Sequence, residues 1–154
     1  MADTSAYKKI IEDWFRTQYL PSKHKGCEIK SGGAKLIWGG TFQYDALVYK
    51  GASLVAVYCL SCSEYKTHGG KGGAGKFNKI KGDILMMVGT ECPNKVLEFS
   101  GITMLEKVKE EQKSGRLPND IQCELVELPQ SMLTLVETVS AASVKEVTPD
   151  QKTG

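Results

Sequence analysis

The residue of this sequence best placed to do chemistry is Asp45, the only charged side chain in the stretch 39–49. Within this stretch apolar and polar residues alternate, a pattern that predicts a β-strand with one buried face. A short turn at residues 50–52 leads into a second β-rich run, from Ser53 to Leu60. The sequence therefore predicts a β-hairpin that carries a carboxylate in its first strand.

Lysines gather on the C-terminal side of this hairpin. The segment 66–81 contains five lysines, one histidine and no acid, although the net charge of the whole chain is only +2. Such a local positive patch attracts phosphate groups. We therefore expect Lys71, Lys76 and Lys79 to contact a nucleic-acid backbone, and the alternative is a solvated loop without a partner.

The glycine-rich part of this segment has the spacing of a phosphate-binding P-loop, from Gly70 to Lys76. That motif continues with Ser or Thr, whose hydroxyl binds Mg²⁺, whereas this chain has Phe77. The sequence therefore argues against nucleotide hydrolysis, although the loop could still bind a nucleic-acid backbone through its amides and lysines.

The composition is that of one ordinary globular domain. The chain has 154 residues, of which 41% are hydrophobic and 25% charged. No apolar run reaches the roughly 20 residues that span a bilayer, and the first residues lack a signal-peptide pattern, so we expect a cytoplasmic protein. The five cysteines are odd in number and irregularly spaced, which predicts free thiols.

Hydrophobic periodicity and turn residues predict an α/β fold, a mixed central sheet flanked by helices. The expected core face of the helix after the lysine-rich loop consists of Phe77, Ile80, Ile84, Leu85 and Val88. We expect a single domain over residues 1–148 and a flexible tail over 149–154. The expected helices are 6–20, 77–88, 102–114 and 131–147, and the expected strands are 27–38 with an interruption, 41–49, 53–62, 95–99 and 121–128.

In this order of elements, and in the residues of the hairpin, the chain resembles the restriction-endonuclease-like superfamily, also called PD-(D/E)xK nucleases. The match is closest to the members of the Holliday-junction-resolvase type, whose core is an α-β-β-β-α-β unit. The glycine pair 39–40, Asp45, the turn at Gly51 and the apolar run 54–57 fit the layout of that core. The resemblance covers roughly residues 6–100.

The resemblance implies a Mg²⁺-dependent phosphodiesterase, a DNA endonuclease in which two carboxylates hold the metal and a lysine orients the attacking water. It places the second acid at position 58 and the lysine at position 60. This chain has Tyr58 and Leu60 there, so its catalytic motif is either moved or lost.

Three alternatives follow from this departure. In the first, the motif is displaced along the chain to Glu64 and Lys66, which form a literal E-x-K. In the second, the acid has migrated to the following helix as Asp83, and Lys66, Lys76 or Lys79 supplies the positive charge. In the third, there is no active site, and the fold serves as a DNA-binding or protein-interaction module.

We therefore expect Asp45, Glu64, Lys66 and Asp83 as catalytic candidates, with Asp45 and Asp83 as the metal ligands. Glu12, on the first predicted helix, is a further candidate because many superfamily members place an acid there. The resemblance also implies DNA as the partner, no membrane, and a homodimer by analogy with other members.

Overall fold

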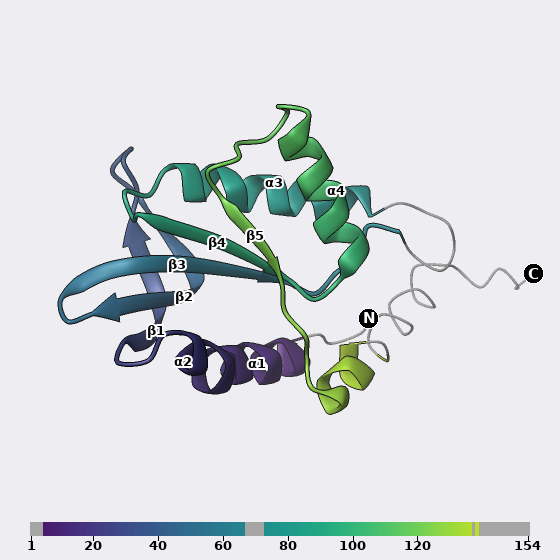
Figure 1. Cartoon of the computed structure of the whole chain (residues 1–154), viewed down its shortest axis with the longest axis horizontal. Helices are drawn as coiled ribbons and strands as arrows, with labels where there is room; N and C mark the ends of the chain where they lie inside the picture. The colour runs from purple at the N-terminus through teal and green to yellow at the C-terminus, as the bar shows by residue number, and fades with distance from the viewer. Residues whose placement is uncertain (1–4, 67–72, 137, 139–154) are drawn as a thin grey trace, which may run out of the picture.

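A five-stranded mixed sheet, with its strands in the order β1-β2-β3-β4-β5, forms the centre of the molecule (Figure 1). The computed structural model describes residues 5–66, 73–136 and 138. The first three strands, β1 (Glu28–Lys35), β2 (Thr41–Lys50) and β3 (Ser53–Ser61), are antiparallel neighbours. The last two, β4 (Asn94–Phe99) and β5 (Gln122–Leu125), add to β3 in parallel.

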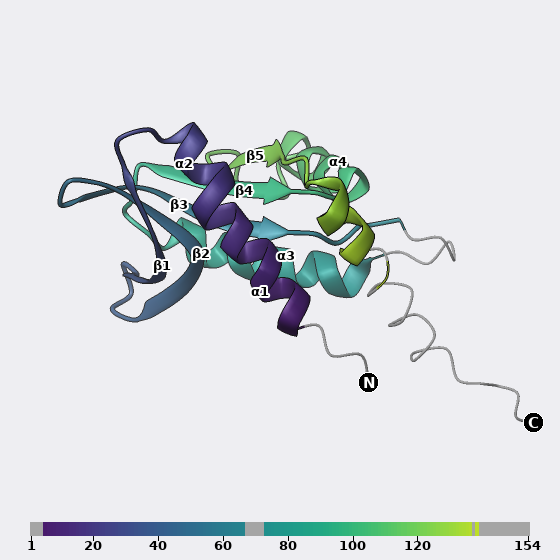
Figure 2. The same cartoon turned by 90° about the horizontal axis from the view of Figure 1, so that it is seen from below.

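Helices cover both faces of this sheet, as the two views show (Figures 1 and 2). One face carries a continuous helical segment of three parts: α1 (Ser5–Trp14), the π-helical turn η1 (Phe15–Tyr19) and α2 (Leu20–Lys23). The other face carries α3 (Ala74–Val88) and α4 (Ile102–Lys113). A further helical stretch at 130–136 lies on the side of α1.

Each face of the sheet buries its own hydrophobic cluster. Toward the first helical segment, Phe15 and Leu20 pack on small and branched strand residues such as Val48. Toward α3 and α4, the larger cluster is built from Val57, Leu97 and their neighbours. Strands whose two faces are both covered explain the nearly continuous apolar runs of β3 and β4. The α/β class and the mixed sheet predicted from the sequence are thus confirmed.

The first helix does not end before Pro21, as its sequence predicts, but continues to Lys23. A proline has no N–H group to donate and crowds the carbonyl one turn earlier, which usually ends a helix. Here the preceding turn is π-helical, and the N–H of Leu20 bonds to the carbonyl of Phe15. This widened turn lets the chain pass through Pro21 at the start of the next helical turn.

The interrupted first strand is one strand with an irregularity. β1 runs without a break from Glu28 to Lys35, and its register with β2 shifts between Lys30 and Gly32. The shift in register coincides with the serine and glycines at 31–33, which separate the two apolar segments of this strand in the sequence. Residues 37–38, expected in the strand, instead form the turn that leads into β2.

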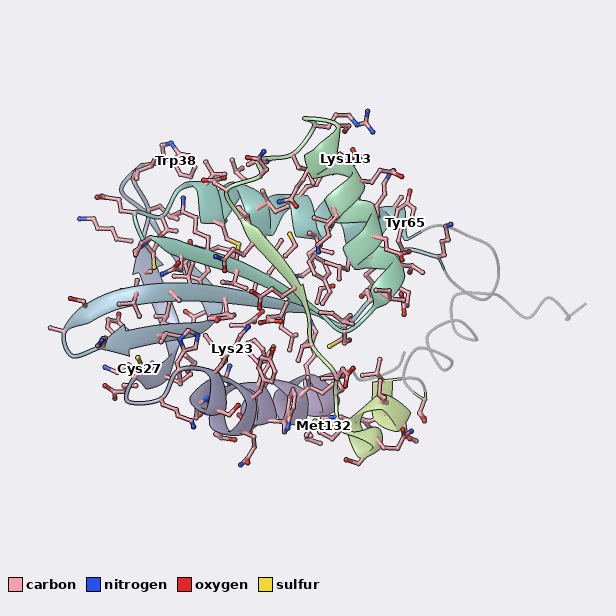
Figure 3. All side chains as sticks on the ribbon, in the orientation of Figure 1. Lys23, Cys27, Trp38, Tyr65, Lys113 and Met132 are labelled. Carbon is pink, nitrogen blue, oxygen red and sulfur yellow. The ribbon has the colours of Figure 1, made fainter. Side chains whose placement is uncertain are left out.

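The predicted core face of α3 is only partly right. Phe77, Ile80 and Ile84 are buried, but Leu85 and Val88 are 53% and 37% exposed, and Met87 is fully buried in their place. The observed stripe follows every third or fourth residue and is narrower than the predicted one. Trp38, an aromatic residue in a tight turn, is also exposed (Figure 3).

The remaining elements agree with the prediction apart from their ends. β5 is shorter than the predicted strand 121–128, and the terminal helix is described only over 130–136 and at 138, so the rest of that prediction and the tail lie outside the described residues. All five cysteines are free thiols, as predicted. Within the described residues, no helix is long and apolar enough to cross a bilayer.

Candidate functional site

Asp45 lies at the point where β2 departs from β3. The pairing of the two strands begins at Ala46, opposite Tyr58. Just beyond that pair, the N–H of Leu60 donates a hydrogen bond to Asp45 Oδ2 at 2.7 Å. The carboxylate therefore takes the place of a strand carbonyl, and the main chain of β3 fixes its position. Arg16 donates to the backbone carbonyl of Asp45 at 2.8 Å and fixes the other side of the residue.

The surroundings of Asp45 disfavour its charge. Burial raises the pKa of Asp45 to about 6, and the hydrogen bond from Leu60 opposes this rise. The negative charges of Glu12, on α1, and Asp83, on α3, raise the pKa further, whereas Lys79 lowers it. A partly buried acid beside other acids is a common feature of functional sites.

Asp83 and Lys79 stand one turn apart on α3 and form an ion pair of 3.4 Å. The side chain of Asp83 is only 18% exposed, and that of Lys79 is 67% exposed. Burial raises the pKa of Asp83, while Lys79 lowers it. The structure thus brings three predicted residues, Asp45, Asp83 and Lys79, into one electrostatic group, together with Glu12.

Glu64 and Lys66 are placed differently. Glu64 Oε1 accepts hydrogen bonds from the backbone N–H and the hydroxyl of Thr103, at 2.9 and 2.5 Å, in the first turn of α4. The N–H of Lys66 donates to the same hydroxyl oxygen, and the Lys66 side chain is exposed. An acid that binds the free N–H groups at a helix N-terminus stabilises that helix. Glu64 therefore holds the β3–α3 connection against α4.

The two strand positions at which the resemblance places an acid and a lysine are occupied by packed side chains. Tyr58 is buried, with its hydroxyl 2.6 Å from His24 Nε2 and its ring against the edge of Phe15. Leu60 is partly buried and packs against the cluster under α1. Both positions therefore carry packed, uncharged side chains, and neither supplies the acid or the lysine that the resemblance implies.

The predicted phosphate contacts fall on two segments. Lys71 lies outside the described residues, while Lys76 and Lys79 occupy the first two turns of α3 and are exposed. Gly73 precedes this helix, and its N–H donates to the carbonyl of Tyr65. Phe77 is buried in the larger hydrophobic cluster, where a P-loop would need a hydroxyl free to reach the phosphates.

The structure also contains a polar cluster that the sequence analysis does not predict. Glu98, on β4, is fully buried, and its Oε2 accepts a hydrogen bond of 3.0 Å from Lys23. Lys23 lies at the end of α2 (Figure 3). Lys23 also pairs with Glu124, the neighbour of Glu98 on β5. Among the described residues, Glu98 Oε1 has no hydrogen-bond partner. Burial raises the pKa of Glu98 to about 7, and the charge of Glu124 adds to this rise.

One signal in the sequence could have indicated this cluster. Glu98 interrupts the apolar run 96–99 of β4, and acids are almost never fully buried without a partner. The partner, Lys23, is 75 residues away along the chain, so only the fold identifies it. The cluster ties α2 to the sheet.

A metal ion would have to be held by the first of these groups. Among the described residues, no set of three or more His, Cys, Asp or Glu side chains is arranged to hold a metal ion. Mg²⁺, however, commonly binds through one or two carboxylates and completes its shell with water and substrate phosphates. Asp45 and Asp83 supply oxygen donors of that kind, from β2 and α3.

Comparisons of the chain with protein-family models, with curated proteins and with solved structures gave no match.

We predict that Asp45→Asn stabilises the protein at pH 7.5. The pKa of Asp45 is raised in the folded state, so the unfolded chain loses this proton first as the pH rises. Stability therefore falls between about pH 4 and about pH 6. An asparagine keeps the acceptor for Leu60 without the charge. Chemical denaturation at pH 7.5 should show a gain on the order of 2 kcal/mol, which disappears near pH 4.

Asp45→Ala serves as the matched variant. It also removes the charge, but it leaves the Leu60 N–H without its acceptor, which costs about 1–3 kcal/mol. We expect it to be less stable than Asp45→Asn at both pH values. If asparagine and alanine destabilise the protein equally at pH 7.5, the charge of Asp45 carries no folding cost.

A second prediction concerns Glu98. Its folded-state pKa is raised to about 7, so wild-type stability should fall as pH rises from about 4.5 to about 7. Glu98→Gln removes this ionisation. Its unfolding free energy relative to wild type should therefore increase between pH 4.5 and pH 8, by on the order of 2 kcal/mol. Glu127→Gln, at an exposed position, is the control and should show no such trend in the same denaturation experiments.

Proposed function

We propose that this protein has a restriction-endonuclease-like fold, binds DNA and hydrolyses its phosphodiester bonds with Mg²⁺. One observation carries the proposal. The main chain of β3 holds the Asp45 carboxylate at the open end of the hairpin, where the charge of Asp83, on α3, acts on it. Two acids fixed on different elements are the minimum that a Mg²⁺-dependent phosphodiesterase needs from its protein.

The topology supports the proposal. The chain order is a helical segment, three antiparallel strands, a helix and a parallel strand. This is the α-β-β-β-α-β order that the resemblance implies. The aspartate lies on the second strand, as the resemblance also implies.

The residues of the site have distinct parts in this chemistry. Asp45 and Asp83 would hold Mg²⁺, which supplies stabilisation of charge on the phosphate and lowers the pKa of a bound water. The Leu60 N–H orients Asp45. Lys79 offsets the charge of Asp83, and its exposed side chain on α3 would contact a phosphate.

DNA would approach along the N-terminal half of α3. Lys76 and Lys79 project from its first two turns, and the N-terminus of a helix favours a bound phosphate. Phosphate contacts of this kind position a nucleic acid without reading its sequence. The proposal therefore implies binding that depends strongly on salt.

A specific observation favours a second candidate, a DNA-binding or protein-interaction module without catalysis. Tyr58 and Leu60 fill the strand positions of the missing acid and lysine, and no group of three possible ligands is preassembled among the described residues. Binding and cleavage experiments separate the two candidates.

We predict that the wild-type protein cleaves single-stranded, duplex or branched DNA in the presence of Mg²⁺, and that Asp45→Asn and Asp83→Asn each reduce the rate at least 100-fold. Asp120→Asn, at an exposed residue paired with Lys95, is the control and should cleave like the wild type. Gel-based cleavage assays with a chelator as blank measure this. Equal rates for wild type and Asp45→Asn on every substrate would contradict the catalytic proposal and leave the binding module.

A separate prediction tests the DNA-binding surface. Lys76→Ala should weaken DNA binding and reduce the slope of log K against log salt by about one, as expected for one lost phosphate contact. Lys113→Ala is the control, because Lys113 lies at the C-terminal end of α4 (Figure 3). Fluorescence anisotropy over a salt series gives both slopes. Identical slopes for Lys76→Ala and Lys113→Ala would remove α3 from the DNA interface.

A further inference from the structure

A small cavity lies between α1 and the end of β3. Its volume is about 60 Å³, and it is lined by Lys8, Ile11, Glu12, Leu60 and Cys62. Lys8 and Glu12 are four residues apart on one helix, so both side chains project from the same face. The cavity is thus lined by a lysine and a glutamate from α1 together with the apolar side chains of Ile11 and Leu60.

This cavity adjoins the Asp45 group. Leu60, which lines the cavity, is the residue whose N–H holds the Asp45 carboxylate. The charge of Glu12 acts on Asp45, and the charge of Lys8 acts on Asp83 and on Cys62. Residues of α1 that line the cavity are therefore close enough to Asp45 and Asp83 for their charges to act on both carboxylates.

We propose that Lys8 supplies the positive charge that contacts the scissile phosphate, in place of the lysine that β3 lacks at position 60. The inference rests on the proposed function. Lys8 and Leu60 line the same cavity, so α1 brings a lysine next to the strand position at which the resemblance places one.

The charges of the site make this assignment specific to Lys8. Three acids converge there, and a phosphodiester adds further negative charge, so positively charged groups must offset them for the substrate to bind and react. Lys79 is already paired with Asp83 and largely exposed. Lys9, the next residue to Lys8, pairs with Asp13 away from the cavity and is 76% exposed.

The test compares Lys8→Gln, Lys8→Arg and Lys9→Gln under conditions in which the wild type cleaves DNA and Asp45→Asn does not. Lys8→Gln should lower kcat at least 30-fold and change KM less than threefold. Lys8→Arg should recover part of kcat, because it restores the charge, and Lys9→Gln should match wild type. Circular dichroism confirms that each variant is folded.

A second readout does not depend on activity. Removing a positive charge beside two metal-binding carboxylates should tighten Mn²⁺ binding in the absence of DNA. We expect Lys8→Gln to lower the Mn²⁺ dissociation constant about three- to tenfold, as measured by electron paramagnetic resonance, and Lys9→Gln to leave it unchanged.

The outcomes separate the two proposals. If the wild type and Asp45→Asn are equally inactive, the proposed function fails, and the role of Lys8 fails with it. If the wild type cleaves and Asp45→Asn does not, but Lys8→Gln retains wild-type kcat, only the assignment of Lys8 is overturned. A raised KM with unchanged kcat would also overturn it, because Lys8 would then be an ordinary DNA contact.

Discussion

The hydrogen bond from the Leu60 N–H to Asp45 is the interaction on which the site depends. It forms where β2 and β3 separate, so it ends the hairpin and at the same time holds a carboxylate where a strand carbonyl would otherwise stand. The same residue, Leu60, pairs in register with Glu98 on β4. One position of β3 therefore connects the two acids whose pKa values burial raises most clearly, Asp45 and Glu98.

These two acids are balanced in different ways. Glu98 is compensated by Lys23, a residue of the structural helix α2, and the resulting cluster fastens that helix to the sheet. Asp45 has no such ion pair among the described residues, and its nearest charges include two further acids. A partly buried carboxylate near like charges costs folding free energy, and proteins retain such costs mainly at functional sites. This difference is why the Asp45 group, rather than the Glu98 cluster, is the proposed active site.

Much of the fold could be predicted because strand alternation and helical periodicity are local signals. The hairpin around Gly51, whose positive φ of 63° suits glycine in the turn, follows from such signals. What local signals could not provide were long-range partners and exceptions to propensity. The π-helical turn carries the helix through Pro21, and Glu98 finds Lys23 only in the folded chain. In the site, Asp45, Asp83 and Lys79 share one region, as predicted. Glu64 instead binds the N-terminus of α4. The two-residue spacing of Glu64 and Lys66 could not reveal this contact, because it carries no information about a distant helix.

The most direct measurement is the anomalous diffraction of Mn²⁺ in crystals grown with a short DNA oligonucleotide. We predict a peak bonded to Asp45 and Asp83, with a DNA phosphate oxygen completing the shell and Lys8 beside that phosphate. A map with no metal between these carboxylates, in which the DNA is bound but Asp45 keeps only its hydrogen bond to Leu60, would contradict it.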